Sequence, residues 1–141
     1  MQILYTAEAT ATGGREGRSR SSDGNLDVQL VPPGSGKEGT NPEELFAVGY
    51  AGCFHSALQI AARKMKLDPQ GSSITTRVQL RREDDGGYGL AVQIEAALPH
   101  VDGDQAQALV DNAHKVCPYS RATRGNIPVE VSVRETASSP A

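Results

Sequence analysis

The chain has 141 residues, a formal charge of −3 and only 4% aromatic residues. A nucleic-acid-binding surface needs a basic stripe and aromatic rings on which bases stack, so this composition excludes one as the expected function. Because a chain of this length can bury one core without further support, we expect one domain over residues 1–135 and a flexible tail over residues 136–141.

The first residues, MQILYTAEATATGG, contain neither the basic region nor the apolar run of a secretory signal. We therefore expect a cytoplasmic protein. Lysines and arginines are scattered rather than gathered on one face, which argues against membrane binding. The most apolar stretch, residues 45–62, is interrupted by polar side chains and predicts a buried helix rather than a membrane span.

The N-terminal part predicts three short strands. Apolar and polar residues alternate over residues 3–11, which indicates a half-buried strand. The sequence TGGREGR (12–18) predicts a turn, and the polar residues 15–23 predict a returning hairpin arm. Asp23-Gly24 then predicts a second turn before a third strand in LDVQLV (26–31).

Helix-start signals coincide in the sequence NPEE (41–44). Asn41 is a good N-cap, Pro42 suits the first helical position, and Glu44 completes the spacing of a capping box. A helix is expected from there to about Lys66. It is apolar almost all round over residues 45–62, so we expect it to be buried on most sides. Every fourth residue of it is small, which allows another helix to approach closely: Gly49, Cys53, Ala57 and Ala61.

The C-terminal part alternates between the two-residue periodicity of strands and the periodicity of a helix. Strands are expected over residues 74–80 and 88–98, joined by a turn at 84–87, and a last strand starts at Ile127. Asp102, with Gln105 three residues on, caps a helix that ends at Cys117-Pro118. The order βββ, α, ββ, α, β predicts an α+β fold with antiparallel sheets covered by helices. A homodimer that sandwiches two copies of the apolar helix would bury it.

Cys53, in GYAGCFHSAL, has several possible roles. His55 lies about 200° round a helix from it, so His55 is not expected to be its base. Neither cysteine shows metal-ligand spacing with a histidine, and two cysteines without a CxxC are too few for a disulfide scaffold. From the residues alone, Cys53 is best interpreted as a small buried side chain, because free cysteine is among the most buried residue types.

Three stretches together resemble one known family. VCPYSRATRGN (116–126), GTNPEELFAVGYAGCF (39–54) and TGGREGR (12–18) are similar to the organic hydroperoxide resistance proteins, the Ohr subfamily of the OsmC/Ohr thiol peroxidases. The similarity extends over nearly the whole chain in the right order. It implies antiparallel sheets wrapped around central helices in an intertwined homodimer.

The resemblance also implies a chemistry for both cysteines. Cys53 would be the thiolate that attacks the terminal oxygen of an organic hydroperoxide, releasing an alcohol and becoming a sulfenic acid. Cys117 would condense with that sulfenic acid, giving water and a disulfide. A dihydrolipoyl group carried on a lipoylated protein would reduce the disulfide again. No bound cofactor and no metal are expected.

Two further residues follow from the family's pattern. An apolar helix raises the pKa of a thiol unless a cation lies beside it, and a guanidinium stays charged while holding a carboxylate with its other face. The pattern places Arg15 beside the thiolate and Glu43 against Arg15. Glu43 and Cys53 are ten residues apart, about 15 Å along a helix, too far for one arginine to touch both. Either the helix breaks, or Glu43 acts on the partner chain's cysteine. We expect the second, a composite site.

Two alternatives stay open at this point. One is a general OsmC-type peroxidase with a broader range of peroxides. The other, from a different class, is a noncatalytic dimeric binding protein in which the cysteines are inert.

Overall fold

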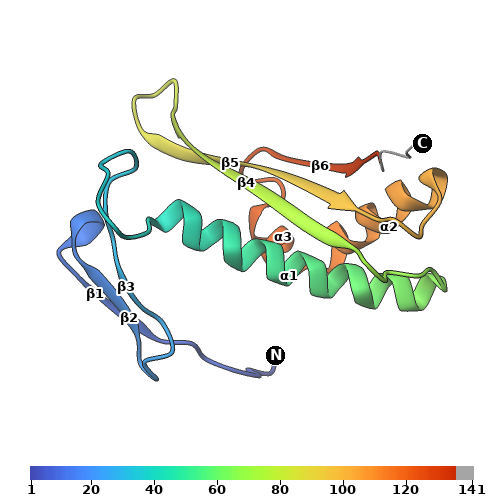
Figure 1. Cartoon of the computed structure of the whole chain (residues 1–141), viewed down its shortest axis with the longest axis horizontal. Coiled ribbons are helices and arrows are strands. Elements are labelled where there is room, and N and C mark those ends of the chain that lie inside the picture. Colours follow the sequence, from blue (N-terminus) through green and yellow to red (C-terminus); the bar gives the residue numbers. More distant parts are fainter. Residues whose placement is uncertain (136–141) are drawn as a thin grey trace. The chain divides into compact units, whose positions relative to one another are not determined.

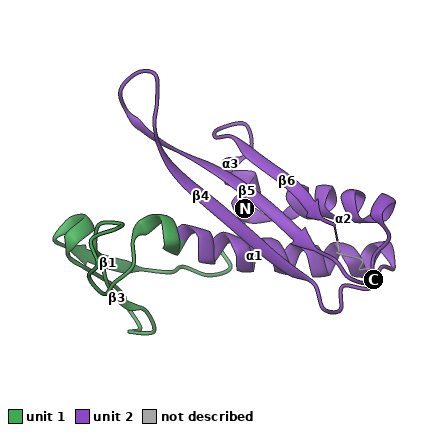
Figure 2. Ribbon diagram, turned by 45° about the horizontal axis from the view of Figure 1, so that its top comes forward, with its two compact units in different colours: residues 1–45 green, residues 46–141 purple. Residues whose placement is uncertain are grey.

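The computed structural model describes residues 1–135, so the predicted tail at 136–141 lies outside the described residues. The chain packs as two compact units, Met1–Leu45 and Phe46 onward (Figure 2). Helix α1 (Pro42–Met65) begins in the first unit and continues into the second.

The first unit contains a small antiparallel sheet. Its strands are β1 (Ala9–Thr12), β2 (Arg18–Ser21) and β3 (Asp27–Gln29), in the order β1-β2-β3, with a 3-10 turn η1 (Gly14–Glu16) between the first two (Figure 1). The predicted strand over residues 3–11 is wrong in its extent, because only its last part pairs with β2. Before Ala9 the pairing continues only as far as Glu8, whose carbonyl accepts a hydrogen bond from the backbone N–H of Ser22 over 2.8 Å, and these residues are exposed.

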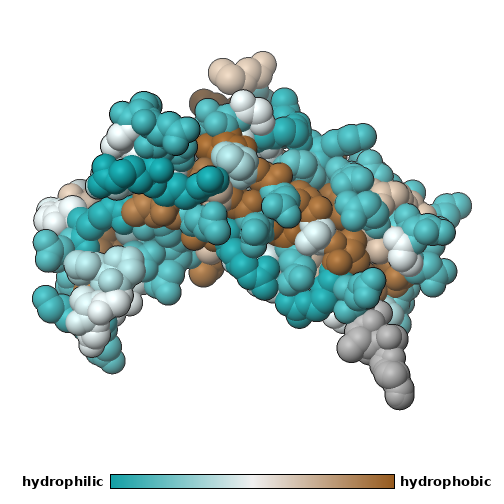
Figure 3. Space-filling model, turned by 90° about the horizontal axis from the view of Figure 1, so that it is seen from above, coloured by the Kyte–Doolittle hydropathy of each residue, from teal (hydrophilic) through white to brown (hydrophobic). Residues whose placement is uncertain are grey.

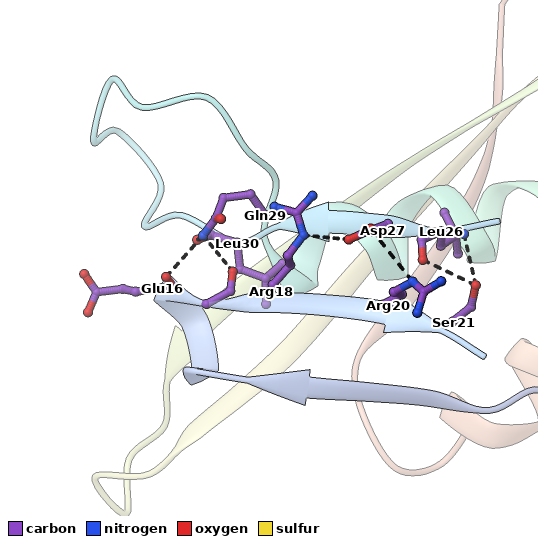
Figure 4. A network of polar contacts seen from close by, with 9 residues as sticks. Glu16, Arg18, Arg20, Ser21, Leu26, Asp27, Gln29 and Leu30 are labelled. Atoms are coloured by element: carbon purple, nitrogen blue, oxygen red, sulfur yellow. Dashed lines mark hydrogen bonds and ion pairs between the residues drawn. The ribbon is translucent and has the colours of Figure 1, made fainter. Parts of the chain in front are cut away.

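Polar side chains hold this sheet together in place of a core. Arg18 Nε donates a hydrogen bond to Asp27 Oδ1 over 2.7 Å, between β2 and β3 (Figure 4). The backbone N–H of Leu26 donates to Ser21 Oγ over 3.0 Å at the far end of the same pair of strands. Since the residues of β1 are all exposed, these directional contacts determine the register more than burial does.

Helix α1 begins as the sequence predicted. The backbone N–H of Glu44 donates to Asn41 Oδ1 over 2.9 Å, so Asn41 is the N-cap. In a capping box the Glu44 carboxylate would accept a hydrogen bond from the backbone N–H of Asn41. Here it accepts one from the Thr40 hydroxyl instead, over 2.7 Å. The helix ends at Met65, one residue before the predicted end.

The second unit contains a mixed three-stranded sheet. β4 (Ser73–Arg82) and β5 (Tyr88–Ala97) are antiparallel, whereas β6 (Val129–Arg134) runs parallel to β5. The prediction of purely antiparallel sheets is therefore wrong for this last pair. Between β5 and β6 the chain forms α2 (Gly103–Val116) and α3 (Pro118–Thr123), and a helical crossover of this kind is what parallel pairing requires.

Helix α3 was not predicted. Pro118 at its first position is a helix-start signal, but six residues are fewer than two turns and carry no readable periodicity. At the start of α2, Asp102 occupies the predicted N-cap position, yet its side chain makes no capping hydrogen bond within residues 1–135.

The core of the second unit lies between α1, the sheet and α2 (Figure 1). Its largest fully buried side chains include Tyr50, Phe54, Leu58, Ile94, Leu109 and Val110. Only one face of α1 is buried in this way, since Val48 is 74% exposed and Ile60 is 45% exposed. The expectation that α1 is buried on most sides is thus not met within a single chain.

The apolar character of α1 also bears on membrane insertion. By length and composition alone α1 would qualify as a membrane span, with a mean hydropathy of 1.3, and a third of that window is buried in the chain's own core. The buried face therefore accounts for part of the apolarity, and the exposed face needs a separate explanation.

The backbone conformation at the end of α1 can be tested by mutation. Lys66 adopts a left-handed conformation (φ 59°), and the backbone N–H of Leu67 donates to the Ala62 carbonyl over 2.9 Å, as in a glycine-type helix cap. Because a side chain in this conformation costs about 1 kcal/mol or more, Lys66→Gly should raise the free energy of unfolding by about 1 kcal/mol. Chemical denaturation measures this.

The matched control is the same substitution two residues earlier. Lys64 lies in the last turn of α1, where glycine is a poor helix former, so Lys64→Gly should lower the free energy of unfolding by about 1 kcal/mol. Destabilisation by both substitutions would contradict the assignment of Lys66 as the cap.

Candidate active site

Arg15 and Glu43, expected from the family pattern to lie together, form a bidentate ion pair. Arg15 Nη1 and Nη2 each donate to one carboxylate oxygen of Glu43, both over 2.8 Å. Arg15 comes from η1 and Glu43 from the first turn of α1, so both belong to the first unit. The hydrogen bond from Arg15 lowers the pKa of Glu43, and the same contact raises the pKa of Arg15.

The turn that carries Arg15 is fixed by hydrogen bonds from Gln29 and by the backbone at Gly17. The Gln29 side-chain amide donates to the Gly17 carbonyl over 2.8 Å and to the Glu16 carbonyl over 3.2 Å (Figure 4). A Cβ at Gly17 would collide with the Thr12 carbonyl oxygen, so only glycine lets the chain turn here. These contacts give the Arg15 guanidinium a fixed base from which to reach Glu43.

The two cysteines, 64 positions apart in the sequence, are in contact in the second unit. Both are free thiols, and Cys117 Sγ lies 3.4 Å from Cys53 Sγ. Cys53 is in the middle of α1, whereas Cys117 is the residue between α2 and α3 and is fully buried. Because sulfurs in a disulfide are about 2.05 Å apart, a small approach of these atoms would suffice to join them.

The surroundings of Cys53 act on its ionisation in opposite directions. Burial raises the pKa of the Cys53 thiol, and the neighbouring Cys117 raises it further. A hydrogen bond from the backbone N–H of Tyr119 acts the other way and lowers it. The balance within this unit keeps the pKa above its usual value, so these groups alone do not produce a thiolate at neutral pH.

The histidines are engaged elsewhere. His55 Nε2 makes a 2.9 Å hydrogen bond with Ser72 Oγ, which confirms that His55 faces away from the thiol. His114 Nδ1 bonds to Ser120 Oγ over 2.8 Å, and His100 is exposed. Among the residues that the structure describes, no three side chains of metal-binding type come together.

A cavity of about 680 Å³ opens beside Cys53. It is lined mainly by α1, from Cys53 to Met65, and on the other side by residues around the α2–α3 junction. Its side chains are mostly apolar, among them Ala57, Ile60 and Val116, with Lys64 at the end of α1. The cavity therefore places a mostly apolar wall beside Cys53.

Sequence reasoning missed the polar contacts around α3. The Tyr119 backbone N–H on Cys53 and the buried hydrogen bonds of Ser120 join residues far apart in the chain. The available signal was the pair of small hydroxyl residues in PYSRAT, which are unusual inside a helix unless they are bonded.

Fold and site together define an α+β protein with two free thiols in contact beside an apolar cavity. The model of the OsmC-like protein family matches residues 34–132. An organic hydroperoxide resistance protein of Xanthomonas axonopodis pv. citri (strain 306) is 50% identical over 137 residues, which cover 94% of this chain and 96% of that protein.

Solved structures agree with these matches. The crystal structure of the organic hydroperoxide resistance protein OhrB of Bacillus subtilis matches with a TM-score of 0.87 at 43% identity, covering 94% of this chain and 100% of that one. An organic hydroperoxide resistance protein from Legionella pneumophila matches with a TM-score of 0.87 at 42% identity, covering 94% and 98%. The chain belongs to the OsmC-like family and, within it, to the organic hydroperoxide resistance proteins. The α+β fold class is thereby confirmed.

The Arg15–Glu43 pair predicts how stability depends on pH. Since the pKa of Glu43 is lowered in the folded chain, its contribution is fully present above about pH 4.3, the ordinary pKa of glutamate, and is lost as the pH falls through the folded value. Glu43→Gln should therefore reduce stability at pH 7 and narrow the difference from wild type below pH 4. Urea denaturation across pH 3 to 7 measures both effects.

Arg15→Gln is the partner control. It removes the other half of the ion pair, so it should abolish the same part of the pH dependence, and the double variant should add nothing more. A wild-type pH dependence in Glu43→Gln would show that the ion pair does not act on Glu43 in solution.

Proposed function

We propose that this protein is a thiol peroxidase that reduces organic hydroperoxides to alcohols. The observation that carries the proposal is the contact of two free thiols, with sulfurs 3.4 Å apart, one of which, Cys53, lines a mostly apolar cavity. The names of the relatives, organic hydroperoxide resistance proteins, support the same substrate class.

The reaction needs three steps. The Cys53 thiolate attacks the terminal oxygen of the hydroperoxide, so the O–O bond breaks, an alcohol leaves and Cys53 becomes a sulfenic acid. The Cys117 thiol then attacks the Cys53 sulfur, forming the disulfide and releasing water. An external dithiol reduces the disulfide by exchange. We assign that last role to a dihydrolipoyl group on a lipoylated protein of the cytoplasm.

The lining of the cavity supports a preference, as part of this proposal, for alkyl hydroperoxides over hydrogen peroxide. Its mostly apolar lining favours an alkyl chain, because each buried methylene contributes about 0.8 kcal/mol. Hydrogen peroxide has no such group and gains nothing from this wall. A general OsmC-type peroxidase would lack the preference, so comparing rates with cumene hydroperoxide and hydrogen peroxide separates the two.

The cation that ionises Cys53 comes, in this proposal, from a second copy of the chain. Burial raises the pKa of Cys53, and Arg15 is a guanidinium already held by Glu43. α1 is unbroken from Pro42 to Met65, so its rise keeps Glu43 about 15 Å from the Cys53 of the same helix. We therefore assign Arg15 and Glu43 of one chain to the Cys53 of its partner.

Exposed apolar surface supports the homodimer. Val48 of α1 is 74% exposed. Figure 3 shows a band of hydrophobic residues on the face that it draws. An apolar surface of this kind is typical of a protein interface. An intertwined homodimer with two copies of α1 at its centre would cover the part of α1 that its own chain leaves exposed.

The cysteine chemistry predicts distinct products for three proteins. After one equivalent of cumene hydroperoxide, wild type should lose about 2 Da per chain as the disulfide forms. Cys53→Ser should consume no hydroperoxide. Cys117→Ser should react once and then accumulate the sulfinic acid of Cys53, since its sulfenic acid has no internal partner. Intact-mass spectrometry and peroxide assays measure this, and equal behaviour of all three proteins would favour the noncatalytic binding protein.

The composite site predicts complementation between two inactive variants. Arg15→Ala and Cys53→Ser each lack one part of the site. In a mixed dimer, the Cys53 of the first variant meets the Arg15 of the second, so one of the two sites is intact. Refolding an equal mixture should recover about a quarter of wild-type activity, because about half of the dimers are mixed.

The outcome separates the two arrangements directly. If Arg15 served the Cys53 of its own chain, no mixed dimer would contain an intact site, and the mixture would stay as inactive as its components. Mixing Arg15→Ala with Glu43→Ala is the matched control, since both changes fall on the same half-site and the mixture should not recover.

A further inference from the structure

Four polar side chains form a connected cluster where α1, α2 and α3 meet. Ser120 Oγ lies 2.8 Å from Tyr50 OH and 2.8 Å from His114 Nδ1. Tyr50 OH also lies 3.0 Å from Thr123 Oγ1. Tyr50 and Ser120 are fully buried and Thr123 is 6% exposed. Burying such groups is costly unless they are hydrogen-bonded, and here each one is.

Ser120 is the centre of this cluster. It is bonded on one side to Tyr50 of α1 and on the other to His114 of α2, while it belongs to α3 itself. Burial, with the nearby charge of Arg124, lowers the pKa of His114, so the imidazole is neutral at pH 7. One hydroxyl therefore joins three helices through two short hydrogen bonds.

Helix α3 depends on such contacts for its position. It has six residues, and a helix of that length is not stable without tertiary support. Besides the Ser120 and Thr123 bonds, its contacts include the Tyr119 ring, stacked on Phe46 with centroids 5.9 Å apart. Just after α3, Arg124 Nη1 donates to the His114 carbonyl over 2.6 Å.

Both sulfurs depend on where α3 lies. Cys117 immediately precedes α3 and is its N-cap residue, and its sulfur lies 3.4 Å from that of Cys53. Tyr119, in the first turn of α3, lowers the pKa of Cys53 through its backbone N–H. A shift of α3 relative to α1 would therefore move Cys117 Sγ away from Cys53 Sγ.

We propose that Ser120 is the positioning residue for disulfide formation: by tying α3 to Tyr50 and to His114, it holds Cys117 Sγ within reach of Cys53 Sγ. The inference rests on the proposed function for its role in turnover. It assigns Ser120 no contact with substrate.

Positioning matters here because two reactions compete for the Cys53 sulfenic acid. In one, the Cys117 sulfur forms the S–S bond, the S–O bond of the sulfenic acid breaks, and the hydroxyl leaves with the thiol proton as water. In the other, a second hydroperoxide molecule oxidises the sulfenic acid to a sulfinic acid and leaves as an alcohol. Only the first depends on the distance between the sulfurs, and a misplacement of about 1 Å can slow such a step about 10²-fold.

The experiment compares Ser120→Ala with Thr76→Val in the full chain. Thr76 Oγ1 donates to the Ala47 carbonyl over 2.7 Å, so Thr76→Val also removes a side-chain hydrogen bond to α1, but one made from β4 rather than α3. Thr76→Val removes one half-buried hydrogen bond and Ser120→Ala removes two, so both variants should be less stable than wild type, Ser120→Ala more so. The control therefore shows how the readouts respond to a lost hydrogen bond on α1 that leaves α3 untouched.

The first measurement is the hydroperoxide concentration at which half of Cys53 is sulfinic acid, determined by mass spectrometry with cumene hydroperoxide. Ser120→Ala should reach this point at a concentration about tenfold or more below that of wild type. Thr76→Val should stay at the wild-type concentration. If lost stability alone were responsible, Thr76→Val would also move to a lower concentration than wild type.

The second measurement is the reduction potential of the Cys53–Cys117 disulfide in a dithiothreitol redox buffer. Loosening α3 lowers the effective concentration of one thiol at the other, so the disulfide of Ser120→Ala should be more easily reduced. A tenfold loss corresponds to a potential about 30 mV higher. This value does not depend on any reaction with peroxide.

Tyr50→Phe changes the same connection from the side of α1. It keeps the ring in the core but removes both hydrogen bonds of the hydroxyl to α3, at Ser120 and Thr123, while the bond between Ser120 and His114 remains. Both readouts should shift in the same direction as in Ser120→Ala. If Ser120→Ala does not fold, the comparison of Tyr50→Phe with Thr76→Val tests the proposal instead.

The two possible failures are distinguishable. If wild type forms the disulfide with hydroperoxide and the folded Ser120 and Tyr50 variants keep its sulfinic-acid threshold and its potential, the role of Ser120 is refuted while the proposed function stands. If wild type forms no disulfide with hydroperoxide, the proposed function fails, and the redox buffer still decides whether Ser120 holds the two sulfurs together.

Discussion

The contact between Cys53 and Cys117 is the constraint on which the second unit depends. Two thiols from distant parts of the chain must lie within 3.4 Å of each other inside an apolar core. The same burial that brings them together raises the pKa of Cys53, although a thiolate is the species that attacks a peroxide. The backbone N–H of Tyr119 offsets this only in part, so the proposed mechanism requires a cation, which we assign to a guanidinium.

The two units divide this task according to their chemistry. The second unit has the apolar core and holds the sulfurs by packing. The first unit has almost no core, and its strands and its Arg15 turn are held by ion pairs and side-chain hydrogen bonds such as those of Asp27 and Gln29. Directional contacts keep a charged side chain in place without burying it, so a polar unit is well suited to present Arg15.

Local signals in the sequence were sufficient for the long elements. Asn41 and Pro42 gave the start of α1, and alternation gave β4 and β5, because caps and periodicity involve residues close together in the chain. The strand over residues 3–11 failed for the opposite reason. Alternation shows that a segment can form a strand but not that a neighbour is long enough to pair with all of it.

The same distinction, between signals from residues close together in the chain and contacts between distant ones, applies to the site. The roles of Cys53 and Cys117 came from the resemblance of whole motifs, since the residues alone favoured an inert buried cysteine at position 53. The pairing of Arg15 with Glu43 is in the structure as the family pattern implied. The Ser120 cluster could not be read from the sequence, because Tyr50 and Ser120 are 70 positions apart and α3 is too short to show a pattern.

The chemistry of that cluster explains why it is polar at all. An apolar replacement of similar shape could fill the same volume, and buried polar groups are often dispensable for stability. Packing of apolar side chains, however, tolerates small sliding movements that hydrogen bonds of 2.8 Å do not, because the latter weaken steeply with distance and angle. Condensation of a thiol with a sulfenic acid requires positions held within about 0.5 Å. The cluster therefore gives α3 a fixed position where stability alone would not demand one.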